Sequence, residues 1–168
     1  MIVFETVRIK VRKWRLSDFD TLLAVYGNPD VCRYIDDGSP LSPDEARAWL
    51  SVTENNYEKR GYGMWALTSR DTGATIGFGG LVHPGNQKTP EVKYALDVNF
   101  WRQGFATEFV SAACSHGFDC FALNSIIATV AAENGASIHV LEKCGFSATG
   151  NQLESDGSIT RIFQKTAI

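Results

Sequence analysis

The chain has 168 residues, of which 44% are hydrophobic and 21% are charged, and its formal net charge at pH 7 is −3. This composition is typical of one globular domain, here residues 1–168, and a chain of this length can bury a core without a metal ion or a disulfide. A small negative charge without a Lys/Arg block argues against binding to nucleic acids or membrane surfaces, both of which need a basic face.

The sequence predicts no segment that would direct the chain into a membrane or out of the cell. The most apolar stretch, residues 105–123, is interrupted by polar and charged side chains, so it falls short of the roughly 18 continuous apolar residues of a membrane helix. The N-terminus has too few consecutive apolar residues for a signal peptide. The four cysteines lack C-x-x-C spacing, which indicates reduced thiols and no metal site. We therefore expect a cytoplasmic protein.

The first predicted elements are a strand and a helix. Residues 7–12 alternate apolar and basic side chains, which is the period of a half-buried strand. A helix is expected to begin at Ser17 and to stop at the Gly-Asn-Pro sequence of residues 27–29.

A second, longer helix has clear signals at both ends. Ser42 can cap its first turn, Pro43 suits the first helical position, and Glu45 completes a capping box. Gly61 favours the left-handed conformation in which many helices end. We therefore expect a helix that runs to about residue 60.

A hairpin and a third strand follow. Residues 62–69 and 75–82 are rich in strand-forming side chains and are joined by a turn sequence, which predicts an antiparallel pair. The Gly-Phe-Gly-Gly sequence at 77–80 lies inside the second of these strands and indicates a bulge or a close backbone approach. A third strand is predicted over residues 91–96.

The second half of the chain predicts two helices and three strands, which complete an α/β or α+β domain with a mixed sheet. The helices are expected over residues 104–121 and 134–143, and the strands over residues 125–130, 146–152 and 160–166. The run SIIATV at 125–130 is continuously apolar, so we expect a strand with both faces covered.

The segment LDVNFWRQGFATE, residues 96–108, is a candidate phosphate site. It passes from a strand to a helix start at Gly104, where unpaired N–H groups and the helix dipole favour an anion. Small side chains at Gly104 and Ala106 would let a phosphate approach the backbone, and Arg102 could add positive charge. Alternatively, the small residues only permit tight packing of the helix on the strand.

A second candidate segment is AAENGASIHVLEKCGF, residues 131–146. Asn134 and Ser137 lie three residues apart at a helix start and therefore share one face. By themselves they could be a helix cap and a first-turn surface residue.

Taken in order, the two segments resemble the GCN5-related N-acetyltransferases, in particular the branch that contains the ribosomal-protein Nα-acetyltransferases (RimJ/RimL-like). The resemblance rests on W-R-Q-G-F-A-T-E, the helix and apolar strand after it, and E-N-x-A-S-I-x-V-L-E-K-x-G-F. The opening E-T-V-R-I-K-V-R, followed by Trp14, Asp18 and Asp20, fits the same branch. The resemblance covers residues 5–148 and implies a mostly antiparallel sheet that splays at a cofactor-binding centre.

The resemblance also implies which residues hold coenzyme A. The end of the third strand would offer its backbone to the pantetheine arm, and the loop before the helix would hold the pyrophosphate. Trp101, at the first loop position, departs from the common Gln or Arg. The implied cofactor-binding residues are Leu96, Val98, Arg102, Gln103, Gly104, Phe105, Ala106, Thr107, Asn134 and Ser137.

Catalytic roles follow from the resemblance for Ser137 and Glu91. Ser137 matches a serine proposed to protonate the departing thiolate, whereas the tyrosine that many members use is replaced by Leu141. Glu91 matches a glutamate considered as the general base, although it could equally be a solvated carboxylate at a strand end. The weaker alternatives for the base are Glu133 and Asp97, and His83, in the loop between strands, could relay a proton or simply lie at the surface.

The resemblance implies an enzyme that uses acetyl-CoA and transfers the acetyl group directly to an amine, with a backbone N–H of the third strand stabilising the oxyanion. No cysteine sits in a motif position with a base partner, so no covalent acyl-enzyme is expected. The acceptor would be a protein N-terminal α-amine or a small-molecule amine. A non-catalytic sensor of coenzyme A is the alternative of another class. The sequence leaves the acceptor and the oligomeric state open, a homodimer included.

Overall fold

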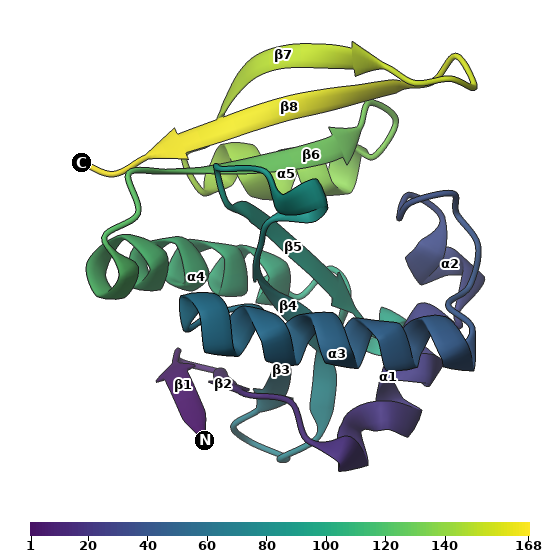
Figure 1. Ribbon diagram of the computed structural model, residues 1–168, viewed down its shortest axis with the longest axis vertical. Helices are drawn as coiled ribbons and strands as arrows, with labels where there is room; N and C mark the ends of the chain where they lie inside the picture. Colours follow the sequence, from purple (N-terminus) through teal and green to yellow (C-terminus); the bar gives the residue numbers. More distant parts are fainter.

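The computed structural model describes residues 1–168 and contains a single eight-stranded sheet with five helices (Figure 1). The strands are β1 (Ile2–Glu5), β2 (Ile9–Arg12), β3 (Met64–Ser69), β4 (Thr75–Val82), β5 (Glu91–Leu96), β6 (Ser125–Ala131), β7 (Ser147–Leu153) and β8 (Ile159–Thr166). The helices are α1 (Phe19–Tyr26), α2 (Pro29–Cys32), α3 (Pro43–Arg60), α4 (Phe105–Phe121) and α5 (Gly135–Lys143).

The sheet is mixed and mostly antiparallel, as expected. Its strand order is β1-β2-β3-β4-β5-β6-β8-β7, and the only parallel neighbours are β5 and β6. Parallel strands need a crossover connection, which here is α4. The chain therefore builds β1 to β5 as a meander, crosses over through α4, and adds β6 with the β7–β8 hairpin.

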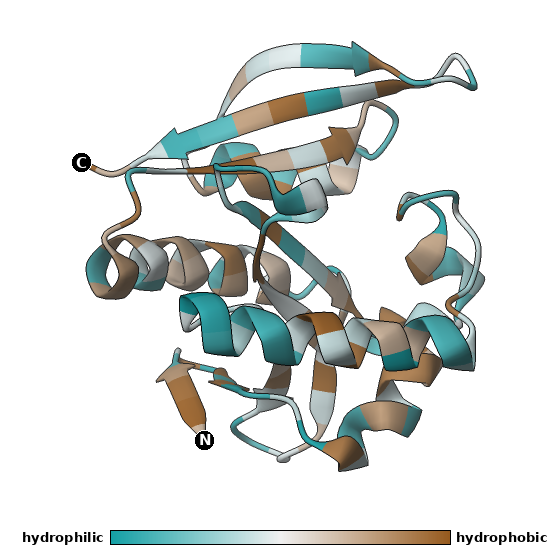
Figure 2. Ribbon diagram, in the orientation of Figure 1, coloured by the Kyte–Doolittle hydropathy of each residue, from teal (hydrophilic) through white to brown (hydrophobic).

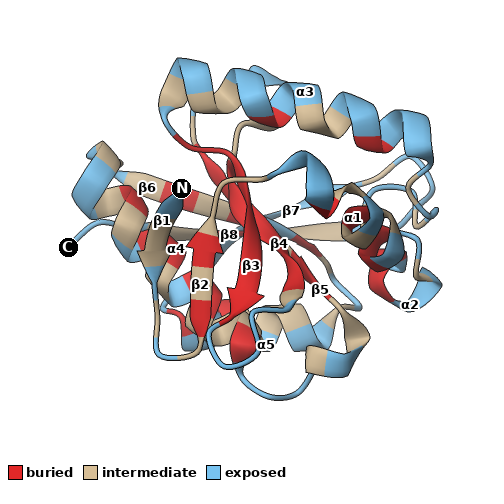
Figure 3. Cartoon of the chain, turned by 90° about the horizontal axis from the view of Figure 1, so that it is seen from below, coloured by how far each residue is buried: buried red, intermediate tan, exposed pale blue.

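Helices cover both faces of the sheet (Figure 3). One core joins the sheet to α4 and α5 and includes Trp65, Phe109 and Phe163. A second core joins the opposite face to α1, α2 and α3 and includes Leu22 and Phe78. In Figure 2 much of α3 has the colours of hydrophilic residues, with hydrophobic positions at intervals along it. This two-sided burial is what holds the central strands in place.

Several local predictions are confirmed. Ser42 and Glu45 form the capping box of α3, and Gly61 ends that helix with a φ of 81°. Strand β5 has the predicted bounds. The glycines of β4 do mark a close approach: a Cβ at Gly79 would collide with the ring of Phe109 on α4. The sequence therefore brings α4 unusually near the sheet.

Three predictions need correction. The strand expected over residues 7–12 begins only at Ile9, because a turn closes Thr6 N–H onto Ile9 O at 2.8 Å and leaves Val7 84% exposed. The preceding strand β1 was not predicted, and the first long helix begins at Phe19, two residues later than expected. Strand β6 is buried on one face only, since no helix covers the face that carries Thr129, which is exposed.

The cysteines and helices add two further observations. Cys32, Cys114 and Cys144 are buried free thiols, and Cys120 is an exposed one. None of the five helices is both long enough and apolar enough to cross a lipid bilayer.

Candidate functional site

Strands β5 and β6 pair at one position only, Glu91 with Ile127, and then separate (Figure 1). We call this separation the β5/β6 fork; its arms are residues 92–96 and 128–131. Asp97 N–H donates to Ile76 O on the β4 side at 2.9 Å. Because N–H directions alternate along a strand, the N–H groups of Tyr94 and Leu96 point into the fork. The fork therefore presents backbone donors with no ladder partner.

The loop between β5 and α4 closes one end of the fork. Trp101 Nε1 donates to Leu96 O at 2.9 Å, and Val98 lies in a 3₁₀ turn just past the strand. Arg102 and Gly104 have φ angles of 59° and 81°, which turn the loop sharply into the helix. The first backbone bond of α4 runs from Glu108 N–H to Gly104 O, and the N–H groups of residues 103–107 have no acceptor. These N–H groups form a concave donor set suited to a phosphate.

Arg8 anchors this loop, and the sequence analysis missed it. Its Nη1 donates to Gln103 O at 2.8 Å, its Nε to Glu108 Oε2 at 2.7 Å, and its guanidinium lies 4.1 Å from the centre of the Phe105 ring. Thr6 Oγ1 also donates to Glu108 Oε1, at 2.6 Å. The turn that displaces the start of β2 thus ties the N-terminus to the first turn of α4.

Glu108 is held in its charged form by these contacts. Burial disfavours the carboxylate, but the hydrogen bonds from Thr6 and Arg8 outweigh burial, so the pKa of Glu108 lies below its ordinary value. A lowered folded-state pKa stabilises the fold above the ordinary pKa of about 4.3, and this contribution disappears as the pH falls through the folded-state pKa.

We expect Glu108→Gln to lower the free energy of unfolding at pH 7 by about 1–3 kcal/mol, the usual contribution of hydrogen bonds to a charged group. The difference from the wild type should shrink as the pH falls below about 4.3. Denaturant unfolding at a series of pH values measures both effects. Asp44→Asn is the control, because the Asp44–Arg47 pair is exposed and should contribute less than about 1 kcal/mol. A Glu108→Gln difference that persists unchanged in acid would contradict this account.

Asn134 and Ser137 lie together at the start of α5. Asn134 Oδ1 accepts a hydrogen bond from Ser137 N–H at 3.2 Å, so the capping role that the sequence allowed is present. The Ser137 hydroxyl contacts the hydroxyl of Tyr94 at 2.6 Å. Leu141 is 2% exposed in the core, so no polar group from that position reaches the fork. The phenol that contacts Ser137 is that of Tyr94 on β5.

Glu91 is buried, with 3% of its surface exposed, so the alternative of a solvated strand-end carboxylate does not hold. The Thr129 hydroxyl donates to Glu91 Oε1 from the neighbouring strand. Ala95 packs on the side of α1 to α3. Glu91 lies four positions before Ala95 on the same strand, and Lys93 lies between them at two positions from each. Since side chains alternate along a strand, Glu91 faces that side and Tyr94 faces α4 and α5.

The other residues considered as the base do not share this position. His83 uses both ring nitrogens, with Tyr62 Oη at 2.9 Å and Gln87 O at 2.8 Å, and burial lowers its pKa. Asp97 accepts from Asn99 N–H in the turn after β5. Glu133 is exposed. Glu91 is thus the one predicted base that is buried on a fork strand.

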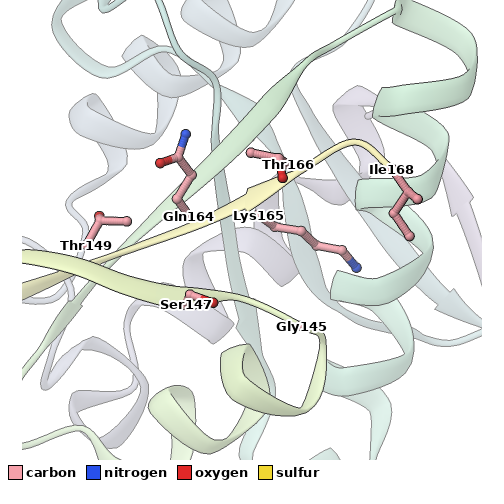
Figure 4. Close-up of a pocket in the computed structure, with 7 residues that line it drawn as sticks. All are labelled: Gly145, Ser147, Thr149, Gln164, Lys165, Thr166 and Ile168. Carbon is pink, nitrogen blue, oxygen red and sulfur yellow. The ribbon is translucent and has the colours of Figure 1, made fainter.

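A hollow of about 460 Å³ lies elsewhere, at the ends of β7 and β8 (Figure 4). Its lining is polar and includes Gly145, Ser147 and Lys165, and the Lys165 ammonium donates to Cys144 O at 2.7 Å. None of the predicted site residues lines this hollow, so it does not coincide with the fork.

Comparison with known proteins gives one consistent result. A family model described as an acetyltransferase (GNAT) domain matches residues 8–147. The uncharacterised N-acetyltransferase YoaA of Bacillus subtilis is 33% identical over 152 residues, which cover 88% of this chain and 84% of YoaA.

Solved structures share the fold. RimL, a ribosomal L7/L12 α-N-protein acetyltransferase in complex with coenzyme A, superposes with a TM-score of 0.82 at 18% identity, covering 99% of this chain and 98% of RimL. Spermidine N-acetyltransferase of Vibrio cholerae, in complex with coenzyme A and spermine, gives a TM-score of 0.78 at 17% identity, with 96% of each chain covered. At these identities the likeness establishes the architecture.

Proposed function

The chain belongs to the acetyltransferase (GNAT) family as an acetyl-CoA-dependent N-acetyltransferase, and from this premise we propose which residues carry the reaction and which kind of amine accepts the acetyl group. The observation that supports the proposal best is the β5/β6 fork. It has a phosphate-type donor loop at one end, the buried Glu91 on one face of the sheet and the Ser137 hydroxyl on the other.

The residues around the fork fit coenzyme A. The five N–H groups of residues 103–107 would bind the pyrophosphate, with Arg102 adding charge at the exposed rim. Leu96 and Val98 would line the pantetheine arm, and Asn134 would contact it from α5. When bound, acetyl-CoA supplies the acetyl thioester. Gly104 has a φ of 81°, and a Cβ there would lie 3.3 Å from Arg8 Nη2, which is why a glycine suits the position.

Residues on the two faces of the sheet have different roles in the proposed reaction. Glu91 accepts the proton that the attacking amine loses, and the N–H groups of Tyr94 and Leu96 stabilise negative charge on the carbonyl oxygen. Ser137 offers its hydroxyl proton to the sulfur as the C–S bond breaks. The buried cysteines are poor nucleophiles, because burial raises the pKa of Cys114 to about 12 and raises that of Cys32 and Cys144. Cys120, which contacts His116 at 3.4 Å, lies at the end of α4 that is remote from the Gly104 loop.

We propose an α-amine, or a similarly weakly basic amine, as the acceptor. A lysine side chain with a pKa of about 10.4 is only about 0.04% neutral at pH 7, whereas an α-amino group near 7.7–8.0 is about 10–15% neutral. Supplying the neutral amine therefore costs about 4.6 kcal/mol for lysine and about 1.2 kcal/mol for an α-amine. A site whose base is one carboxylate without a histidine partner suits the second case.

Release of free thiol from acetyl-CoA, measured against a panel of amines, tests the proposal. The panel contains an α-amine peptide, the same peptide blocked at its N-terminus but carrying a lysine, and spermidine. We expect turnover to be highest with the α-amine peptide. A preference for the ε-amine or for spermidine would contradict the acceptor proposal, and binding of coenzyme A without turnover of any amine would favour the sensor.

A further inference from the structure

The hydroxyl groups of Tyr94 and Ser137 are each other's only hydrogen-bond partners in the protein, at 2.6 Å. Tyr94 belongs to one arm of the β5/β6 fork, and Ser137 lies in the first turn of α5, directly after the other arm. The bond joins residues 43 positions apart in the sequence. The pair therefore spans the fork, on the side of the sheet that carries α4 and α5.

The hydrogen bond between Tyr94 and Ser137 leaves one of their two hydroxyl protons free. Two hydroxyl groups carry two protons, and the bond between them uses one. A phenol is a stronger acid than an aliphatic alcohol, so the favoured arrangement has Tyr94 as donor and the Ser137 oxygen as acceptor. The Ser137 proton then has no protein acceptor, and it is available to a group that lies in the fork.

We propose that Tyr94 is a positioning residue that orients the hydroxyl of Ser137, so that the serine O–H points at the leaving sulfur of the acetyl donor. This inference rests on the role proposed above for Ser137. Tyr94 touches the serine and acts through it. Its phenol, on strand β5, replaces the polar group that Leu141 on helix α5 does not supply.

The chemistry balances without an ionised tyrosine. The electron pair of the C–S bond goes to sulfur, whose growing negative charge is met by the Ser137 O–H. The sulfur takes the Ser137 hydroxyl proton and leaves as the thiol, whose ordinary pKa is about 8.5; the serine regains a proton from water, and the proton lost by the amine reaches water through Glu91. Burial raises the pKa of Tyr94, and the contact with Ser137 lowers it by less, so Tyr94 keeps its proton at neutral pH.

The test compares Tyr94→Phe, Ser137→Ala and the double variant with the wild type. Tyr94→Phe should lower kcat about tenfold, and Ser137→Ala should lower it by up to about 10²-fold. The double variant should be no slower than Ser137→Ala, because Tyr94 acts only through that serine. Calorimetric affinity for coenzyme A should stay within about twofold in Tyr94→Phe, which would separate orientation of the serine from a general loss of structure. Tyr62→Phe is the matched control, since its hydroxyl bonds to His83 outside the fork.

A second readout does not depend on turnover. The ultraviolet absorbance of tyrosinate, titrated in wild type and in Tyr94→Phe, isolates the titration of Tyr94. In Ser137→Ala the pKa of Tyr94 should move up, because the serine contact that lowers it is gone. An unchanged pKa, additive losses in the double variant, or full activity of Tyr94→Phe beside a slow Ser137→Ala would overturn this inference alone. Full activity of Ser137→Ala would instead overturn the role proposed for the serine.

Discussion

Gly104→Val should weaken the binding of coenzyme A at least tenfold, about 1.4 kcal/mol, in a protein that still folds. Gly104 has a φ of 81°, where a β-branched side chain is strained, and a Cβ there would lie 3.3 Å from Arg8 Nη2. Both effects would disturb the loop whose N–H groups are free. Isothermal calorimetry with coenzyme A measures the loss directly.

Gly157→Val provides the matched control for this variant. Gly157 has a φ of 86° in the β7–β8 turn, and a Cβ there would meet nothing within 4 Å. It therefore carries the same backbone strain without touching the loop, and it should bind coenzyme A as the wild type does. An unchanged affinity in folded Gly104→Val, or an equal loss in both variants, would defeat the pyrophosphate assignment.

Glu91→Gln should lower kcat/KM for an α-amine peptide at pH 7 by about 10²–10⁴-fold, the usual contribution of a general base. The defect should shrink as the pH rises towards 9, because the amine then loses its proton to solvent and needs the carboxylate less. Steady-state kinetics over this pH range, with wild type and variant side by side, measure the effect.

Two further variants sharpen the Glu91 experiment. Thr129→Val removes the hydroxyl that contacts Glu91 and should produce a smaller defect with the same dependence on pH. Glu142→Gln changes an exposed carboxylate on α5 and should leave kcat/KM unchanged. If the Glu91→Gln defect is flat with pH, Glu91 is not the base.

Elements with strong local signals could be predicted from the sequence. The capping box at Ser42, the left-handed end at Gly61 and the strand at residues 91–96 depend on side chains within a few positions of one another. Strand β1 could not be predicted in the same way. It is a four-residue edge strand, and what holds it is its pairing with β2 across the Thr6 turn.

The burial of β6 shows a second reason why a structural feature could not be predicted from the sequence. Its apolar run is compatible with cover on one face or on two, and the choice depends on where helices from other parts of the chain pack. The helices α4 and α5 cover the face of Ile126 and Ala128, and the face of Thr129 stays open. From that face the Thr129 hydroxyl reaches Glu91, which is itself buried.

The residues of the candidate site fall into the same two classes, those marked by local motifs and those placed by contacts between distant parts of the chain. The loop at Gly104 and the cap at Asn134 are local motifs, and they were found by their spacing. Arg8, Tyr94 and Thr129 reach their partners across 95, 43 and 38 positions of the chain. Nothing near each residue in the sequence marks these contacts, because only the folded chain brings the partners together.

The single ladder pair between β5 and β6 also has a consequence for how the two parts of the sheet are held together. Strands β1 to β5 pair with their neighbours in sequence, whereas β6 pairs with β8 and β8 with β7, so the sheet consists of two groups of strands. One core packs both groups against α4 and α5, and the hydrogen-bonded ladder of the sheet is thinnest at the boundary between the groups. The fork is that boundary. A ligand bound there would add contacts between the two groups at the place where the sheet itself supplies a single pair.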